Sequence, residues 1–143
     1  MDAGAIETSA RGMRAQRARM EVVAANLAHA DTTSAAREER TAPDGARWTR
    51  HVPFRRQVAL IEPGLTVRVV DDPSPFRVEH EPDHPHAVPS SSGEPDAGTL
   101  YRPNVHPMAE MVEMMSAARA YEANVAAMET AKAMAATVLR ILA

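Results

Sequence analysis

Apolar residues near the end of the chain recur in alternating steps of three and four. The steps run through Met111, Met114, Ala118, Tyr121, Val125, Met128, Ala135, Leu139 and Leu142, with Lys132 as the one polar interruption. A repeat of this kind places a narrow apolar seam along one helix, and such a seam packs against another helix. The pattern predicts a long C-terminal helix that needs a helical partner.

A second apolar seam occupies the first thirty residues. Ile6, Met13, Met20 and Leu27 recur every seven residues; Ala3, Ala10 and Ala24 hold the complementary positions, with Arg17 as the exception. The simplest explanation for two seams is the core of an ordinary two-helix hairpin. However, both are built mostly from Ala, Met and Leu, and the chain has only one Trp, two Tyr and two Phe. Because large aromatic and branched side chains dominate most cores, we expect the two seams to bury too little apolar surface for a self-sufficient core.

Proline divides the chain into three parts. All 11 prolines lie between Pro43 and Pro107. Because proline breaks helix interiors but suits the first helical turn, we expect one helix from near Asp2 to about Ala30 and another from Pro107 to the end. Gly12 is a weak point in the first of these helices. The predicted organisation is an N-terminal helix within 1–34, a middle segment over 35–102 and a C-terminal helix within 103–143.

The middle segment contains signals for a small β element. Residues 57–61 and 65–70 read as two short strands joined by a Glu-Pro-Gly turn at 62–64, and a third extended piece follows at 76–80. Residues 82–98 are rich in Pro, Ser, Asp and Gly, which predicts a loop or a partly disordered excursion. The fold class expected is therefore mainly α with a short β-hairpin, the terminal helices pairing as a coiled-coil-like hairpin.

Composition narrows the possible functions. The net charge is −3 with no long run of one sign, so a nucleic-acid footprint is not indicated. The chain has no cysteine, which excludes disulfides and thiol catalysis. The N-terminus lacks the continuous apolar stretch of a cleavable signal peptide, and no segment is apolar enough to span a bilayer. We expect neither a signal peptide nor a membrane span.

Candidate catalytic chemistry is confined to one histidine-rich stretch. His80, His84 and His86 alternate with acidic residues, and together these side chains could offer ligands to zinc or nickel. Intervening prolines place them on an extended loop rather than on one helix face, which disfavours a metal site. No nucleophile elbow, phosphate loop or dinucleotide turn is present. The sequence therefore predicts no enzyme, no cofactor and no small-molecule substrate.

Two asparagines stand beside the seams. Asn26 and Asn124 are expected inside helices, where asparagine has poor propensity and competes for backbone hydrogen bonds. Their positions suggest hydrogen bonds to a neighbouring chain or to a turn. Simple solvation of both side chains is the alternative.

Three blocks of the sequence resemble a known family. The first runs from Ser9 to Thr32 and contains Asn-Leu-Ala-His-Ala-Asp-Thr at 26–32. The second is Asp-Pro-Ser-Pro-Phe-Arg at 72–77 followed by Glu-Pro-Asp-His-Pro-His-Ala at 81–87. The third joins Pro-Asn-Val at 103–105, Glu-Met-Val at 110–112 and Ala-Ala-Arg-Ala-Tyr-Glu-Ala-Asn-Val at 117–125. In this order the blocks are similar to the flagellar basal-body rod proteins, in particular to the proximal-rod members.

The resemblance implies a structural subunit of a tubular, helically arranged assembly. It implies that the terminal helices pack in the inner core against other rod proteins and copies of this chain. The residues expected to take part are Ile6, Met13, Met20, Asn26, Leu27, Met111, Met114, Tyr121, Asn124, Val125, Met128, Leu139 and Leu142. It also implies export through the flagellar export apparatus without a cleaved signal, and a final place in the periplasmic part of the basal body.

Another interpretation of the seams stays open at the level of sequence. A small coiled-coil adaptor would use the same two seams to form a discrete dimer and would not polymerise. A metal-binding protein built on the histidine stretch is the more distant alternative.

Overall fold

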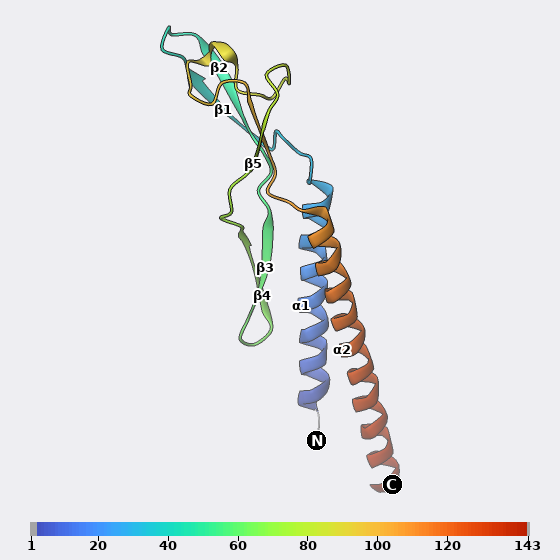
Figure 1. Ribbon diagram of the computed structural model, residues 1–143. Helices are drawn as coiled ribbons and strands as arrows, with labels where there is room; N and C mark the ends of the chain where they lie inside the picture. The colour runs from blue at the N-terminus through green and yellow to red at the C-terminus, as the bar shows by residue number, and fades with distance from the viewer. Residues whose placement is uncertain (1–2, 143) are drawn as a thin grey trace. The chain divides into compact units, whose positions relative to one another are not determined.

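The computed structural model describes residues 3–142 of the chain. Two long helices lie at its ends, and six short strands lie between them (Figure 1). The elements in order are α1 (Ala3–Ala28), β1 (Ala36–Thr41), β2 (Arg47–Val52), β3 (Gln57–Glu62), β4 (Thr66–Asp71), β5 (Arg77–His80), the 3-10 helix η1 (Ser90–Ser92), β6 (Thr99–Arg102) and α2 (Pro107–Leu142). The mainly helical class and the two terminal helices are confirmed.

The chain forms two compact units. The first, the helical unit, consists of the described residues within 1–25, 57–70 and 108–143, and so contains most of α1 and α2 together with the β3–β4 pair. The second, the strand unit, consists of residues 26–56 and 71–107, with the β1–β2 and β5–β6 pairs. Each unit is assembled from segments far apart in the sequence.

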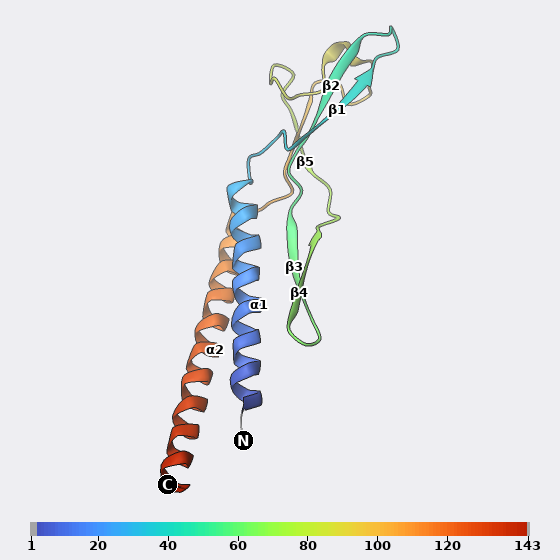
Figure 2. The same ribbon diagram turned by 180° about the vertical axis from the view of Figure 1, so that it is seen from behind.

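Within the helical unit, α1 and α2 run side by side, as both views show (Figures 1 and 2). Arg19 of α1 forms an ion pair with Glu113 of α2. Further along, a Cβ atom added to Gly12 would lie 2.6 Å from Oδ1 of Asn124. The glycine that looked like a weak point in α1 therefore provides the space into which the Asn124 side chain packs.

The predicted seam of α2 consists of two rows of residues at seven-residue spacing, one starting at Met111 and one at Met114. The row that is buried in the structure lies one residue before the Met111 row. Glu110, Ala117 and Ala131 are buried and Asn124 is half-buried, all at seven-residue spacing. Met111, at the start of the predicted row, is exposed. Small side chains at the contact allow a close approach of helices, so alanine positions lie inside while larger apolar neighbours face outward. The other predicted row, which contains Met114, Tyr121 and Met128, is half-buried.

The β3–β4 hairpin confirms the two strands predicted around the Glu-Pro-Gly turn. The amide of Leu65 donates to the carbonyl of Glu62 over 3.0 Å, which closes the turn. Gly64 has φ +92° and Leu65 has φ +61°. The first value suits glycine, whereas the second places a branched residue in the left-handed region.

Three strands were not predicted from the sequence. β1 reads Ala-Arg-Glu-Glu-Arg-Thr, so it lacks the apolar alternation that identifies a strand in a sequence. All six of its residues are exposed. It pairs antiparallel with β2, with Arg37 opposite His51 and Arg40 opposite Trp48. β6, which was also missed, pairs antiparallel with β5 and sets Leu100 opposite Glu79.

Residues 82–98 form a folded loop rather than a disordered excursion. The amide of Val88 donates to the carbonyl of Thr99 (2.9 Å), and the amide of Gly98 donates to the carbonyl of Val88 (2.8 Å). Ala87 and Val88 are buried, as are Leu100 and Val105 further along the chain. The loop thus supplies part of the small core of the strand unit.

Glycine-to-alanine substitutions in α1 test the fit between Gly12 and Asn124. Alanine favours a helix interior over glycine by about 1 kcal/mol. Gly4→Ala meets nothing within 4 Å and should raise the helicity and thermal midpoint measured by circular dichroism. Gly12→Ala should lower both, because its methyl group would collide with Asn124.

The double variant Gly12→Ala with Asn124→Ala should recover the loss, since the colliding side chain is gone. An equal gain in helicity at positions 4 and 12 would show that the two helices do not pack in this way in the isolated protein.

Candidate functional site

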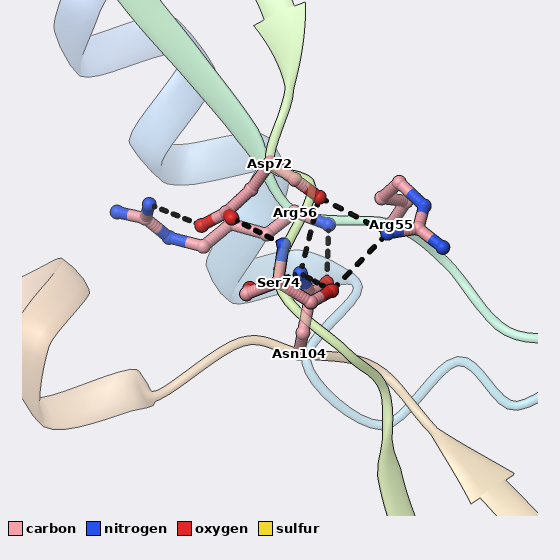
Figure 3. Close-up of polar contacts among 5 residues, drawn as sticks. All are labelled: Arg55, Arg56, Asp72, Ser74 and Asn104. Atoms are coloured by element: carbon pink, nitrogen blue, oxygen red, sulfur yellow. Dashed lines mark hydrogen bonds and ion pairs between the residues drawn. The ribbon is translucent and has the colours of Figure 1, made fainter.

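A cluster of polar groups around Asn104 joins three connections of the strand unit (Figure 3). Asn104 lies just before α2, Arg55 and Arg56 lie between β2 and β3, and Asp72 and Ser74 lie between β4 and β5. Prolines flank these positions at 73, 75 and 103. Because proline lacks an amide donor, these prolines interrupt regular strand pairing, and among the five residues at these positions it is the amide of Asp72 that continues it, donating to the carbonyl of Arg56 over 2.8 Å. We call these five residues the Asn104 node.

The amide side chain of Asn104 is the centre of the node. Its Oδ1 accepts from the backbone amide of Arg56 over 2.8 Å. Its Nδ2 donates to Oγ of Ser74 over 2.8 Å and to the carbonyl of Ser74 over 3.2 Å. Asn104 is almost completely buried, so these contacts replace water for both ends of its amide.

Charged groups complete the node. Nη1 of Arg56 lies 3.0 Å from Oδ2 of Asp72, and Nη1 of Arg55 donates to the carbonyls of Asp72 (3.1 Å) and Ser74 (3.2 Å). The guanidinium of Arg55 also lies 4.2 Å from the ring centre of Phe76, in cation–π range. The arginines thus fasten the 72–76 connection from two sides.

Asp72 is held in its charged form. Its Oδ1 accepts from the amide of Ser74 over 2.9 Å. Hydrogen bonds from Ser74 and the adjacent Arg56 guanidinium lower the pKa of Asp72 below its ordinary value, against the opposing effect of burial. Since its folded pKa is depressed, Asp72 contributes stability above its ordinary pKa, and this contribution is lost as the pH falls through the folded value.

The predicted packing residues lie in several environments. Ile6, Met13, Met20 and Leu27 of α1 are half-buried, and Val125 of α2 is half-buried as well. Met111 is exposed, and Leu139 is 64% exposed. The side chain of Leu142 lies outside the described residues.

The two asparagines beside the seams differ in their environments. Asn26 has no exposed surface, so simple solvation is wrong for this residue. Nδ2 of the half-buried Asn124 donates to the carbonyl of Ala120 over 2.7 Å. This bond to the preceding helical turn, together with the contact at Gly12, keeps the side chain of Asn124 within its own chain.

An apolar face on the first turns of α2 was not singled out from the sequence. Met108, Met111, Val112 and Met115 are each about half or more exposed, and they are spaced by three and four residues. At about 100° per residue they lie on the side of α2 roughly opposite the buried row of Ala117 and Ala131. The spacing of three and four residues could have indicated this face in the sequence. The longer heptad pattern, which includes only Met111 of the four, drew attention away from it. We call these four residues the methionine face.

The histidine stretch does not form a metal centre among the described residues. Nδ1 of His84 accepts the amide of His86, and Nδ1 of His86 lies 2.7 Å from Oγ1 of Thr33. His80 is exposed on β5. The Nδ1 atoms of His84 and His86 are therefore engaged with the protein itself. Within the part of the chain that the structure describes, neither helix has the length and apolar character needed to cross a membrane.

Comparisons with known proteins agree with this architecture. The family model "Flagella basal body rod protein" matches residues 6–35, and the model "Flagellar basal body rod FlgEFG protein C-terminal" matches residues 96–141. The matched segments contain most of α1 and most of α2. Segments at both ends of the chain thus match models of flagellar basal-body rod proteins.

Full-length relatives narrow the assignment. The flagellar basal-body rod protein FlgC of Bacillus subtilis strain 168 is 32% identical, over 95% of this chain and 95% of its own length. FlgC of Borreliella burgdorferi is 34% identical, over 96% and 95%, and FlgC of Escherichia coli O157:H7 is 35% identical, over 85% and 84%. The chain belongs to the FlgC family of flagellar basal-body rod proteins. The resemblance predicted from the sequence is confirmed, and the chain is a structural protein of the basal-body rod.

Removing the centre of the Asn104 node should destabilise the strand unit. Asn104→Ala eliminates the acceptor of the Arg56 amide and three polar contacts of a buried side chain, at a cost of about 2–4 kcal/mol. Urea unfolding followed by fluorescence of Trp48, the single tryptophan and a residue of β2, measures the effect. Ser74→Ala is the matched control, because it removes only one of these acceptors and should cost less. Equal losses in the two variants would contradict a central role for Asn104.

The lowered pKa of Asp72 predicts how the stability of the protein depends on pH in the acid range. Asp72→Asn should lower stability at pH 7 and flatten the loss of stability below about pH 4, because the variant has no carboxylate to protonate. Asp71→Asn, at the exposed neighbouring position, should leave the acid part of the stability profile unchanged. Unfolding midpoints between pH 2.5 and 7 provide the comparison. Identical acid profiles for wild type and Asp72→Asn would refute the assignment.

Proposed function

We propose that this protein is a subunit of the proximal flagellar rod that packs through both faces of α2. One side of α2 lies against α1 of its own chain, and the methionine face is offered to helices of neighbouring rod subunits. The observation that carries the proposal is the exposure of four large apolar residues in the first turns of α2, with Met108 at 75%. Exposed apolar patches of this kind mark surfaces that another protein covers.

The chemistry of this face suits packing against more than one neighbour. Methionine side chains are unbranched and flexible, so they adapt to surfaces of different shape. A rod built from several related proteins presents each subunit with neighbours that are similar but not identical. Interfaces related by a screw operation repeat without closing, which yields a tube rather than a discrete ring.

The predicted seam residues have two roles in the proposal, depending on whether they are half-buried or exposed. Half-buried positions such as Met114, Tyr121 and Met128 serve contacts within the helical unit first. Leu139 and its neighbours Val138 and Ile141 form a separate exposed apolar stretch near the end of α2 that would be available to other subunits. Coiled-coil-like pairing of the terminal helices in the assembled rod belongs to this proposal.

Export and location follow from the same proposal. Helices with thin apolar faces gain much of their stability from packing, so the termini of the free subunit would be weakly ordered and would fold fully on assembly. Such a chain suits passage through the flagellar export apparatus in an unfolded state, without a cleavable signal peptide. The assembled protein would then reside in the periplasmic part of the basal body, as a structural element without catalytic activity or cofactor.

A charge introduced into the methionine face should block assembly. Val112→Asp places a carboxylate at a position that neighbouring helices would cover, and an uncompensated buried charge strongly opposes association. We expect loss of swimming when the variant replaces the wild-type protein, while the subunit is still exported. Motility in soft agar and the presence of the subunit in purified basal bodies are the measurements.

Thr130→Asp is the control for position along α2, because Thr130 is exposed on the same side of the helix as Val112 but lies about five turns beyond it, past the methionine face. It should support normal motility. Full motility with Val112→Asp would refute packing through this face.

Asn124→Ala in the same assay tests the half-buried asparagine of α2, and we expect this variant to impair rod assembly more than export. A stable dimer of the purified protein in sedimentation experiments would instead favour the coiled-coil adaptor.

A further inference from the structure

Three imidazole rings meet in the strand unit. His51 lies on β2, and His84 and His86 lie in the folded loop 82–98, just before its buried residues Ala87 and Val88. The rings of His51 and His86 are stacked with centres 4.3 Å apart. The ring of His84 meets that of His86 edge-on at 5.3 Å. The loop is thus held against β2 by contacts between imidazole rings.

Hydrogen bonds fix each ring in place. Nδ1 of His51 lies 2.8 Å from Oγ of Ser34, and Nδ1 of His86 lies 2.7 Å from Oγ1 of the buried Thr33. Nδ1 of His84 accepts from the backbone amide of His86 over 3.0 Å. Because a backbone N–H can only donate, Nδ1 of His84 carries no proton in this arrangement. Protonation of that nitrogen would remove the bond that closes the loop.

The charged surroundings of His51 favour its neutral form. Arg37 of β1 stands opposite His51 in the strand ladder and adds positive charge beside it. On the loop side, Glu81 interacts electrostatically with His84 but is also paired with Arg102 at 3.0 Å, and the exposed Asp83 directly precedes His84. The Thr33–Ser34 segment contributes hydroxyl groups without charge. A proton added to His51 therefore meets Arg37 on one side and the imidazole of His86 on another.

We propose that the loop carrying His84 and His86 is a pH-sensitive latch, docked on β2 when its histidines are neutral and released when they are protonated. Two effects act in the same direction. Protonation of His51 and His86 places positive charges in stacked rings, and protonation of His84 breaks its bond to the amide of His86. This proposal concerns the strand unit alone and does not depend on how the helices assemble.

The direction of the pH effect follows from His51. Burial, the neighbouring His86 and Arg37 together lower the pKa of His51 below its ordinary value of 6.5. A depressed pKa means that the folded state binds the proton less readily than the unfolded state. The stability of the latch is therefore fully present above about pH 6.5 and is lost as the pH falls below it.

Trp48 gives a local readout of the latch. It is the single tryptophan of the chain and lies three residues before His51 on β2. We expect the urea midpoint of wild-type protein, followed by Trp48 fluorescence, to fall by about 0.5 M or more between pH 7.5 and pH 5.0. His51→Phe keeps an aromatic ring against His86 but cannot be protonated, so its midpoint should fall by less than half as much.

His29→Phe is the matched control. His29 is also stacked on an aromatic ring in the strand unit, but its partner is Phe54 at 4.7 Å, outside the cluster. This variant should retain the wild-type pH dependence. The proposal is overturned if the wild-type midpoint does not change, or if His51→Phe falls as much as wild type.

If His51→Phe does not fold at pH 7.5, His86→Asn replaces it with the same expected and contrary results. NMR titration of the wild-type imidazoles provides a measurement that needs no variant. Shifts of the residue 82–86 amides that follow the titration of His51 below pH 6.5 support the latch, and amides that remain unchanged there overturn it.

Discussion

The structure of the strand unit depends on the hydrogen bonds of one buried amide. The β1–β2 and β5–β6 pairs are each two-stranded, and an isolated pair of strands is marginally stable in water. Between these pairs the chain passes through connections interrupted by prolines, which lack an amide donor, and a backbone bond between these connections runs from the amide of Asp72 to the carbonyl of Arg56. Asn104 joins these connections because a carboxamide offers both a donor and an acceptor, which neither a carboxylate nor an aliphatic side chain does. The polar node therefore stabilises a unit whose apolar core consists of a few small residues.

The helical unit solves a different problem with small residues. Gly12 admits Asn124, and Ala117 and Ala131 occupy the buried row of α2. Contacts between such residues bring helices close but bury little apolar surface per residue. The larger apolar side chains of α2, including Met108 and Met115, remain on the outside. This division suits a rod subunit, whose helices contribute to a core shared among several chains.

Several features could be predicted from the sequence, and their physical reasons are local. The absence of proline at both ends defined the helices, and the Glu-Pro-Gly turn defined the β3–β4 hairpin. The missed strand β1 carries four charged residues and no apolar face, so its pairing with β2 depends on backbone bonds that no side-chain pattern reports. The contacts of the Asn104 node could not be predicted from the sequence either, because its members lie up to 49 residues apart, from Arg55 to Asn104. The blocks around Phe76 and Asn104 were nevertheless recognised through their resemblance to rod proteins.

The sequence by itself determined the family, the two terminal helices and their apolar character, because periodicity and short motifs are properties of neighbouring residues. Only the tertiary structure decided which side of α2 is buried. A heptad defines two adjacent rows, and the close approach at Gly12 places Asn124 rather than Val125 in the contact. The tertiary structure also brought His51 to His84 and His86, which lie more than thirty residues away in the sequence. Such contacts depend on the folding of distant segments onto one another, and no local pattern encodes them.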